Sequence, residues 1–389
     1  MKDNANPQPF LVFGAPRIEQ AEIDEVTAVL HSGWLGTGPR VAQFESDFAR
    51  YKGVSREHVA AVNSCTAALH LSLVAAGVGP GDEVITTPLT FCATVNSIIH
   101  AGATPVLADI DVDSMNISPR EIERRITPRT RAIVPVHFAG RPCAMDEIMV
   151  LARSHGITVI EDCAHAIEAE YKGRPIGTIG DFGCFSFYVT KNIVTGEGGM
   201  TLCADQDTAA RVRRLALHGM SKDAWKRFDS TGYQHYEVVE AGFKYNMMDL
   251  QAAIGLHQLG RIEPYWLRRR DIWKQYQEAF RDLPLGLPDE PEADTRHALH
   301  LYTLRVDQRR CGVERDAFLN AMTALKIGVG VHYRSLTSYA FYRDRFAWRS
   351  EDCPNATLVG DETLSIPLSA KLDEGEIARI IDAVRSIVS

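Results

Sequence analysis

The chain has 389 residues, of which 45% are hydrophobic and 24% are charged, and its formal net charge is −8 at pH 7. This length predicts one large domain or two of moderate size, and the composition excludes a disordered or collagen-like chain. The acidic balance disfavours non-specific binding of nucleic acid, so an anionic substrate would need a local site to hold it.

The sequence predicts a cytoplasmic location. It begins Met1-Lys2-Asp3-Asn4, without the basic segment and apolar core of a secretory signal, and no apolar run reaches the ~18–20 residues that span a bilayer. The eight cysteines include no C-x-x-C pair, and no H-E-x-x-H helix occurs. A zinc ribbon and a metalloprotease site are therefore not expected, and we predict no bound metal and no membrane partner.

Short apolar runs alternate with helical patterns between about residues 59 and 204, and the first helical stretch runs from Thr66 to Ala76. Runs rich in Val and Ile, punctuated by Gly, Pro or Asp, are typical of strands buried on both faces, and helices between them imply parallel pairing. The predicted strands are Val59–Val62, Glu83–Thr86, Pro105–Ala108, Ala132–Val136, Ile157–Ile160, Phe182–Val189 and Met200–Cys203. We therefore expect an α/β fold with a mostly parallel, doubly wound sheet, in which ligands bind beyond the carboxyl ends of the strands.

The pattern changes after residue 245. The segment from Met248 to about Asp282 is helical except at Pro264, which should break or kink the helix. A smaller α+β unit is expected beyond it, built from strand His300–Val306, helix Val313–Leu325, strand Gly328–Tyr333 and helix Glu374–Ile387. The predicted domains are a large one over residues 1–260 and a small carboxyl-terminal one over residues 261–389.

The first strand-to-helix turn reads Asn63-Ser64-Cys65-Thr66-Ala67-Ala68. Its small residues let backbone N–H groups at a helix N-terminus approach an anion, with Ser and Thr hydroxyls as further donors. A phosphate-binding turn is one interpretation, and a plain helix cap is the other. No G-x-x-x-x-G-K-[ST] motif occurs, which disfavours a P-loop.

Asp162 follows a predicted strand, at the edge of the sheet where ligand sites form. The carboxylate could cap the next helix, or it could hold a cationic ring nitrogen protonated through a charge-assisted hydrogen bond. His165 comes three residues later, one helical turn away if a helix begins here.

Lys191 lies between an apolar strand and the Gly-rich segment Thr195–Met200. An exposed loop lysine is the ordinary interpretation. A lysine that is partly dry and close to other cationic groups has a lowered pKa, however, and offers a neutral amine for Schiff-base chemistry. The turn at residues 63–68, Asp162 and Lys191 would together supply an anion donor, a partner for a pyridinium nitrogen and an amine. These are the groups that pyridoxal phosphate requires.

The chain also resembles, over nearly its whole length, the fold-type I pyridoxal-phosphate enzymes of the sugar aminotransferase family, the DegT/DnrJ/EryC group. The matching motifs are Gly33–Pro39, Ser64–Leu69, Thr90-Phe91, Glu161–Ala166 and Phe185–Gly199. The resemblance implies pyridoxal 5'-phosphate as cofactor, Lys191 as the catalytic Schiff-base lysine and Asp162 as a catalytic residue on the pyridine nitrogen. It implies the following further cofactor contacts: Phe91 stacked on the ring, His165 near the ring oxygen, and Thr66, Ala67 and Ser186 at the phosphate.

Three departures from the family pattern matter. Many members read G-Y-N-Y-R where this chain reads Gly242-Phe243-Lys244-Tyr245-Asn246. Lys244 thus replaces an asparagine that the family gives to the partner subunit's cofactor phosphate, and Asn246 replaces an arginine associated with substrate. Cys65 replaces a common glycine, a change from which we expect little effect. The resemblance implies a homodimer with active sites at the interface, each completed by Lys244 of the neighbouring chain.

The same variant, together with Gly330-Val331-His332-Tyr333-Arg334, is similar to the branch that aminates UDP-linked 4-keto-pentoses and hexoses. The resemblance implies substrate contacts at Trp34, Asn246 and His332. The segment Ser221–Tyr236 could close over a nucleotide or could be a solvated surface loop, and it contains Lys222, Trp225, Lys226, Arg227 and Tyr233.

The expected reaction is the transfer of an amino group from glutamate to a nucleotide-linked keto sugar, a UDP-4-keto sugar, for amino-sugar, polysaccharide or lipopolysaccharide biosynthesis. One alternative is a dehydratase or an aminoshikimate-type aromatising enzyme on the same fold. Sugar dehydratases of this fold carry His at the position of Lys191, whereas an aromatising enzyme keeps the lysine. The other alternative is a non-catalytic nucleotide-sugar sensor, which is disfavoured because both Lys191 and Asp162 are present.

Overall fold

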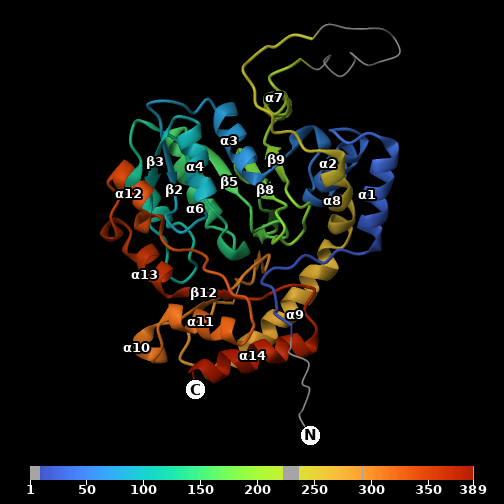
Figure 1. Cartoon of the computed structure of the whole chain (residues 1–389). Coiled ribbons are helices and arrows are strands. Elements are labelled where there is room, and N and C mark those ends of the chain that lie inside the picture. The colour runs from blue at the N-terminus through green and yellow to red at the C-terminus, as the bar shows by residue number, and fades with distance from the viewer. Residues whose placement is uncertain (1–8, 222–235, 291, 389) are drawn as a thin grey trace.

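The computed structural model describes residues 9–221, 236–290 and 292–388, and its centre is a seven-stranded sheet (Figure 1). The strand order is β1-β9-β8-β5-β4-β2-β3. The strands are β1 (Val59–Val62), β2 (Glu83–Thr86), β3 (Thr104–Leu107), β4 (Thr130–Val134), β5 (Thr158–Asp162), β8 (Phe182–Ser186) and β9 (Gly199–Cys203). Neighbouring strands are parallel except where β9 pairs with β1 and β8. The predicted α/β fold with a mostly parallel sheet is confirmed.

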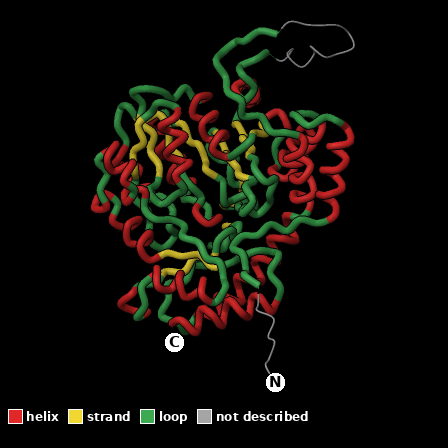
Figure 2. The backbone as a smooth tube through the Cα atoms, viewed as in Figure 1, coloured by secondary structure: helices red, strands yellow, loops and turns green. Residues whose placement is uncertain are grey.

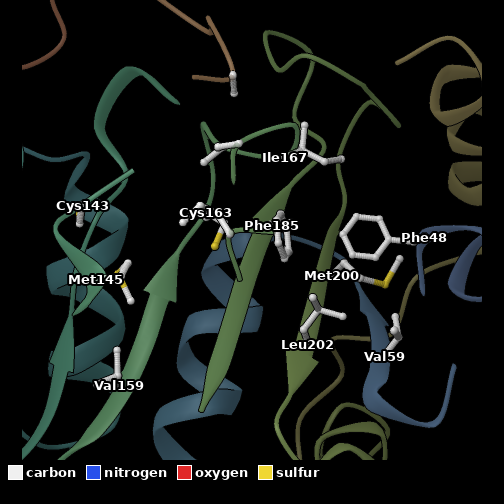
Figure 3. Close-up of a cluster of buried hydrophobic side chains, with 14 of the residues drawn as sticks. Phe48, Val59, Cys143, Met145, Val159, Cys163, Ile167, Phe185, Met200 and Leu202 are labelled. Carbon is white, nitrogen blue, oxygen red and sulfur yellow. The ribbon is translucent and has the colours of Figure 1, made fainter. Parts of the chain in front are cut away.

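Helices cover both faces of the sheet. Successive side chains of a strand point to opposite faces, so Val159 and Ile160 of β5 enter two different cores. One core packs under α2 (Pro39–Lys52), α6 (Met145–His155) and α8 (Asp249–Gly260). Figure 3 shows part of it, where Phe48 of α2 faces the strand residues Phe185 and Met200. The other core packs under α3 (Cys65–Ala75), α4 (Cys92–His100) and α7 (Gln206–Leu215).

The predicted strand Phe182–Val189 is too long. β8 ends at Ser186, and Phe187 begins the connection to β9: its N–H donates to the carbonyl of Gly198, and its carbonyl accepts the N–H of Thr195. These bonds close the connection between β8 and β9 into a compact turn, and Lys191 lies within it.

The helix predicted over residues 248–282 is two helices. α8 ends at Gly260 and α9 (Ile262–Phe280) begins two residues later, so the break lies at Arg261 and not at Pro264. Pro264 falls in the first turn of α9, where its missing N–H costs no hydrogen bond because that turn has no preceding carbonyls to bind.

A separate antiparallel pair, β11 (Tyr302–Arg305) with β12 (Thr363–Ile366), packs against α9, α11 (Arg315–Ala324) and α14 (Glu374–Val388). Figure 2 shows these two short strands in yellow below the central sheet. The remaining elements are α1 (Gln20–Ser32), α5 (Pro119–Arg125), β6 (Glu170–Tyr171), β7 (Arg174–Pro175), β10 (Thr295–Arg296), α10 (Gln308–Cys311), α12 (Ala340–Phe346) and α13 (Pro354–Glu362).

The predicted strand Gly328–Tyr333 is wrong. This segment makes one isolated bridge, from Gly330 to Ser365 of β12, and otherwise leads toward the carboxyl ends of the large sheet, where Tyr333 bonds His165. The predicted helices Val313–Leu325 and Glu374–Ile387 correspond to α11 and α14.

The division at residues 260 and 261 stays a prediction. Ile262, at the start of α9, belongs to a core of the large sheet, whereas Ile272 and Phe280 belong to the core around β11 and β12. Among the described residues, no helix is both long enough and apolar enough to cross a membrane.

Candidate active site

Asp162 is the last residue of β5 and is buried at the carboxyl end of the sheet. Thr94 Oγ1 donates to its Oδ2 at 2.8 Å, and the N–H of Ala164 donates to its Oδ1 at 3.1 Å. Burial raises the pKa of Asp162, while these two bonds and the nearby Lys191 act to lower it. A buried carboxylate with a lysine near it is therefore present where the sequence predicts a ligand site.

Lys191 lies half-buried in the turn between β8 and β9, and its N–H donates to the carbonyl of Tyr188 at 2.9 Å. Burial lowers the pKa of its ammonium group to about 8, against the opposing effect of Cys65 and Asp162. The amine therefore lies near the carboxylate of Asp162 and near Cys65, the first residue of α3.

The turn before α3 packs closely on the sheet. The hydroxyl of Ser64 accepts the N–H of Ala67 at 3.1 Å, so the helix-cap interpretation holds for that donor. Gly199 of β9 lies beneath the turn, and a Cβ there would lie 2.4 Å from the carbonyl carbon of Ser64. Gly199 also pairs with Ser186 of β8. The structure thus brings Ser186 to the same place as Thr66, whose N–H has no intrahelical partner.

His165 is buried, and its Nε2 lies 3.1 Å from the hydroxyl of Tyr333. Its other ring nitrogen, Nδ1, is buried without a hydrogen-bond partner among the described residues. Burial, together with Lys191, His300 and His332, holds the pKa of His165 well below 6.5, so the ring is neutral. A buried ring nitrogen without a partner indicates that a polar group of a ligand could bind there, close to Lys191.

Phe91 precedes α4 and is 59% exposed, and its ring lies near that of Tyr333, at a centroid distance of 6.2 Å. An aromatic ring with a free face at this position is available for stacking on a planar ligand.

The three predicted substrate residues fall into two places. Trp34 Nε1 donates to the carbonyl of Thr37 at 3.0 Å, and Asn246 Nδ2 donates to the hydroxyl of Thr37 at 2.7 Å. His332 lies elsewhere: its Nδ1 is 3.0 Å from the hydroxyl of Ser365, and burial and Lys191 lower its pKa to about 4. The structure therefore brings His332 to the Lys191 side and joins Trp34 with Asn246 around Thr37.

Lys244 is exposed, and it belongs neither with Trp34 and Asn246 nor with His332. Its carbonyl lies 3.4 Å from Nδ2 of Asn63, and the carbonyl of Tyr245 accepts the N–H of Asn63 at 2.7 Å. The Lys244 segment thus runs beside the turn before α3. The predicted nucleotide loop, with Lys222, Trp225, Lys226, Arg227 and Tyr233, lies outside the described residues.

A cavity opens beside Lys191, and several of its polar lining residues are ones that sequence reasoning missed, among them Asn192, Arg269 and His300. Asn192 could have been suspected because it adjoins Lys191 in the sequence. His300 and Arg269 carry no such signal, since they lie before β11 and on α9, far from Lys191 in the sequence.

One group of possible metal ligands occurs among the described residues, namely His137, Glu161 and Cys163, all buried. Glu161 already accepts hydrogen bonds from His137 and from the backbone N–H groups of Gly177, Ile179 and Gly180, at 2.7–3.1 Å. Its lone pairs hold the turn at residues 177–180 in place, so we assign it a structural role.

The residues present fit pyridoxal phosphate. Lys191 supplies the amine, Asp162 supplies the carboxylate, and the turn over Gly199 supplies donors for a phosphate. The unpartnered Nδ1 of His165 and the open face of Phe91 are two further features that a polar aromatic ligand would satisfy.

Comparison with known proteins agrees with this chemistry. Residues 16–385 match the sequence model of the DegT/DnrJ/EryC1/StrS aminotransferase family. The spore coat polysaccharide biosynthesis protein SpsC of Bacillus subtilis is 50% identical over 380 residues, which cover 97% of each chain.

Two solved structures are similar over nearly the full length. The aminotransferase TlmJ of Streptoalloteichus hindustanus is 34% identical, with a TM-score of 0.88, over 97% of this chain and 98% of that one. Spr1654 of Streptococcus pneumoniae, in its PMP form, is 31% identical, with a TM-score of 0.89, over 97% and 98% of the two chains. Spr1654 has also been solved in a PLP form.

Proposed function

The chain belongs to the DegT/DnrJ/EryC1/StrS aminotransferase family, and from this premise we propose that it moves an amino group from glutamate to a keto sugar carried on a nucleotide. The chain is a sugar aminotransferase, and its cofactor is pyridoxal 5'-phosphate, as predicted from the sequence. The nucleotide, the sugar and the donor are the proposed parts.

The observation that carries the proposal is the proximity of Lys191 to the buried carboxylate of Asp162. Bound pyridoxal phosphate supplies an electron-accepting ring for breaking a carbon–hydrogen bond next to an amino group. We assign Lys191 as the group that takes this proton from one carbon and returns it to another. Its pKa of about 8 suits both tasks near neutral pH, because each form of the amine is then populated.

Asp162 is assigned to hold a proton on the ring nitrogen of the cofactor. Each oxygen of the Asp162 carboxylate accepts one hydrogen bond, from the hydroxyl of Thr94 or from the N–H of Ala164, and these bonds fix its orientation. Each oxygen keeps a second lone pair, which can accept a hydrogen bond from the ring nitrogen. Lys191 near this carboxylate favours its charged form, and a charged acceptor holds a pyridinium proton far better than a neutral one.

The remaining predicted contacts are proposed as follows. Thr66 and Ser186 hold the phosphate, His165 lies at the ring oxygen and Phe91 stacks on the ring. Ala67 lies beside the phosphate in the first turn of α3 but donates no hydrogen bond to it, since its N–H is already bound to Ser64.

We propose a UDP-linked 4-keto sugar as the acceptor. The support is the Lys244 and Asn246 variant and the segment at residues 330–334, which carries His332 to the Lys191 side. SpsC is described as a protein of spore coat polysaccharide biosynthesis, which supports a role in making an amino sugar for a polysaccharide.

We also propose a homodimer. Ile23 and Leu30 of α1 are exposed and lie seven residues apart, hence on one face of the helix, and exposed Trp34 and Leu35 follow them. Contiguous exposed apolar side chains mark association surfaces. We propose that a second copy covers this surface and that Lys244 of each copy lies near its partner's site.

The test is a substrate panel. Purified enzyme is given glutamate and, in turn, UDP-, dTDP- and GDP-linked 4-keto sugars, and the amino-sugar product is measured by mass spectrometry. We expect turnover with the UDP-linked sugar at least tenfold above the others, because one lost hydrogen bond to a charged group costs about that factor. Activity on dTDP- or GDP-sugars alone would overturn the choice of nucleotide.

The donor is tested separately by mixing the cofactor-loaded enzyme with glutamate, glutamine, aspartate or alanine and following the cofactor absorbance. Glutamate should convert the bound cofactor fastest. Formation of an aromatic product from a cyclic substrate would instead favour the aromatising alternative.

A further inference from the structure

A buried ion pair lies behind the turn that carries Lys191. The guanidinium of Arg269 on α9 donates to Oε1 of Glu168, and both side chains are almost inaccessible, at 3% and 0% exposure. Oε2 of the same carboxylate accepts Nδ2 of Asn192 at 2.7 Å. A carboxylate is retained in the interior only when charge and hydrogen bonds satisfy it, so Glu168 is held in one orientation.

Glu168 determines which way the Asn192 amide points. Nδ2 of Asn192 lies 2.7 Å from Glu168 Oε2 and 3.1 Å from the carbonyl oxygen of Ala298, and both of these atoms only accept hydrogen bonds. The amide nitrogen must therefore face them, and Oδ1 must face the other way. Oδ1 lies 2.8 Å from Nδ1 of His300. Because an amide oxygen cannot donate, Nδ1 of His300 carries the hydrogen of this bond.

The protonation state of Nε2 of His300 follows from that of Nδ1. Burial, together with the nearby Lys191, His332 and Arg269, holds the pKa of His300 well below 6.5, so its ring is neutral. A neutral imidazole that carries its hydrogen on Nδ1 has an unprotonated Nε2, which can only accept. His300 and Lys191 line the same cavity, and the ring of His165 lies against that of His300 at a centroid distance of 4.4 Å.

A lysine that moves a proton between two carbons must be held in place between the two transfers, since its four-carbon stem is flexible. Because His300 and Lys191 line one cavity, we propose that Nε2 of His300 accepts a hydrogen bond from the Lys191 side chain while the lysine transfers the proton. Glu168 and Asn192 are then positioning residues that fix this acceptor. The inference rests on the proposed assignment of Lys191 as the reacting lysine. A neutral acceptor suits the task, because a second carboxylate would hold the ammonium charge and raise the pKa of the amine.

Two substitutions of His300 separate this role from a purely structural one. The amide of asparagine replaces Nδ1 of histidine and can keep the bond to Asn192, whereas the longer amide of glutamine replaces Nε2 and can keep the acceptor. Both variants are loaded with pyridoxal phosphate, and the first-order conversion of the cofactor by saturating amino donor is followed by stopped-flow absorbance. Thermal unfolding of each variant is measured alongside.

We expect His300→Gln to convert the cofactor within about threefold of wild type and His300→Asn to be slower by about ten- to a hundredfold, the effect of one hydrogen bond to a charged group. The donor concentration for half-maximal rate should stay within about twofold in both, because the acceptor contacts Lys191 and not the donor. The reverse order of the two variants, or wild-type rates in both, would overturn the role of Nε2.

A second readout needs neither cofactor nor turnover. The nitrogen-15 shifts of His300 in the cofactor-free protein, assigned by their loss in His300→Gln, should show hydrogen on Nδ1 and a bare Nε2. A neutron structure of the wild-type protein reads the same hydrogen position and requires no variant to fold. Hydrogen on Nε2 in either measurement contradicts the inference.

Failure of this inference can be told from failure of the assignment on which it rests. Borohydride reduction of the loaded wild-type enzyme, followed by peptide mapping, identifies the lysine that carries the cofactor. A label on another lysine would overturn the assignment of Lys191 and this inference together. A label on Lys191 with the reverse order of the His300 variants would overturn the inference alone.

Discussion

At the scale of single residues, the burial of Lys191 has a measurable effect on the rate at which the protein takes up its cofactor. Attack on the aldehyde of pyridoxal phosphate requires the neutral amine, and the neutral fraction rises as pH passes the pKa, which is about 8 here and about 10.4 for an exposed lysine. We expect the rate of cofactor uptake by the cofactor-free protein to rise between about pH 7 and 9 and then level off. Stopped-flow absorbance across this range measures it.

Asp162→Asn provides the control for this profile. Asp162 acts to raise the pKa of Lys191, so removing its charge should move the midpoint to lower pH. An uptake rate that keeps rising through pH 10 in the wild-type protein would contradict the lowered pKa.

The sequence predicted the groups that are chemically unusual, and it missed the groups that orient them. Asp162 and Lys191 could be singled out because a carboxylate at a strand end and a lysine between an apolar strand and a Gly-rich segment are informative on their own. His300 could not, because an amide 108 positions away specifies its tautomer. Such a contact exists only after the segment before β11 packs on the large sheet, where the N–H of His300 donates to the carbonyl of Ala139.

At the scale of elements, the close approach of the α3 turn to β9 depends on a missing side chain at residue 199. A Cβ on Gly199 would lie 2.4 Å from the carbonyl carbon of Ser64 and 2.7 Å from the N–H nitrogen of Cys65, both backbone atoms. We expect Gly199→Ala to lower the free energy of unfolding by about 1–3 kcal/mol and to weaken cofactor binding, since the turn must move away from Ser186. Denaturant unfolding and cofactor titration measure the two effects.

Gly260→Ala is the matched control. Gly260 ends α8, and no atom of the described residues lies within 4 Å of the Cβ that the substitution adds. The change should be neutral or stabilising by up to about 1 kcal/mol, because alanine favours a helix over glycine. Equal stability of the two variants would show that the turn is not held by residue 199.

Strands buried on both faces were the elements that the sequence predicted best, because such strands need apolar side chains at every position and so appear as continuous runs of Val and Ile. Elements whose ends depend on tertiary contacts were predicted less well. Pro264 suggested a helix break three residues late, since proline is tolerated in a first turn. The segment at residues 328–333 has the composition of a strand, but it pairs with β12 only at Gly330.

At the scale of the whole molecule, the proposed homodimer predicts complementation between two inactive variants. Lys191→Ala should lack the reacting amine, and Lys244→Ala should lack a cation near the partner's phosphate, which carries close to two negative charges. In a mixed dimer, both lesions fall in one site and the other site keeps both lysines. We expect co-expressed chains to recover activity approaching about a quarter of wild type, for random pairing and one working site per mixed dimer.

The outcome also separates the two possible positions of Lys244. Its segment runs beside Asn63 of its own chain, so it could serve its own site. If Lys244→Ala is impaired and mixing restores nothing, Lys244 acts within its own chain. Full activity of Lys244→Ala alone would remove the residue from the site altogether.

The course of α9 sets a limit on how this protein can change in length. Its 19 residues begin in a core of the large sheet with Ile262, pass the buried ion pair at Arg269 and end in the other core with Phe280. Each residue added to a helix turns everything after it by about 100° and advances it by about 1.5 Å. A single inserted or deleted codon in this stretch would therefore remove Arg269 or the apolar face from its partner, whereas surface connections can gain or lose residues freely. The spacing of the two cores is thus set by the number of residues in one helix.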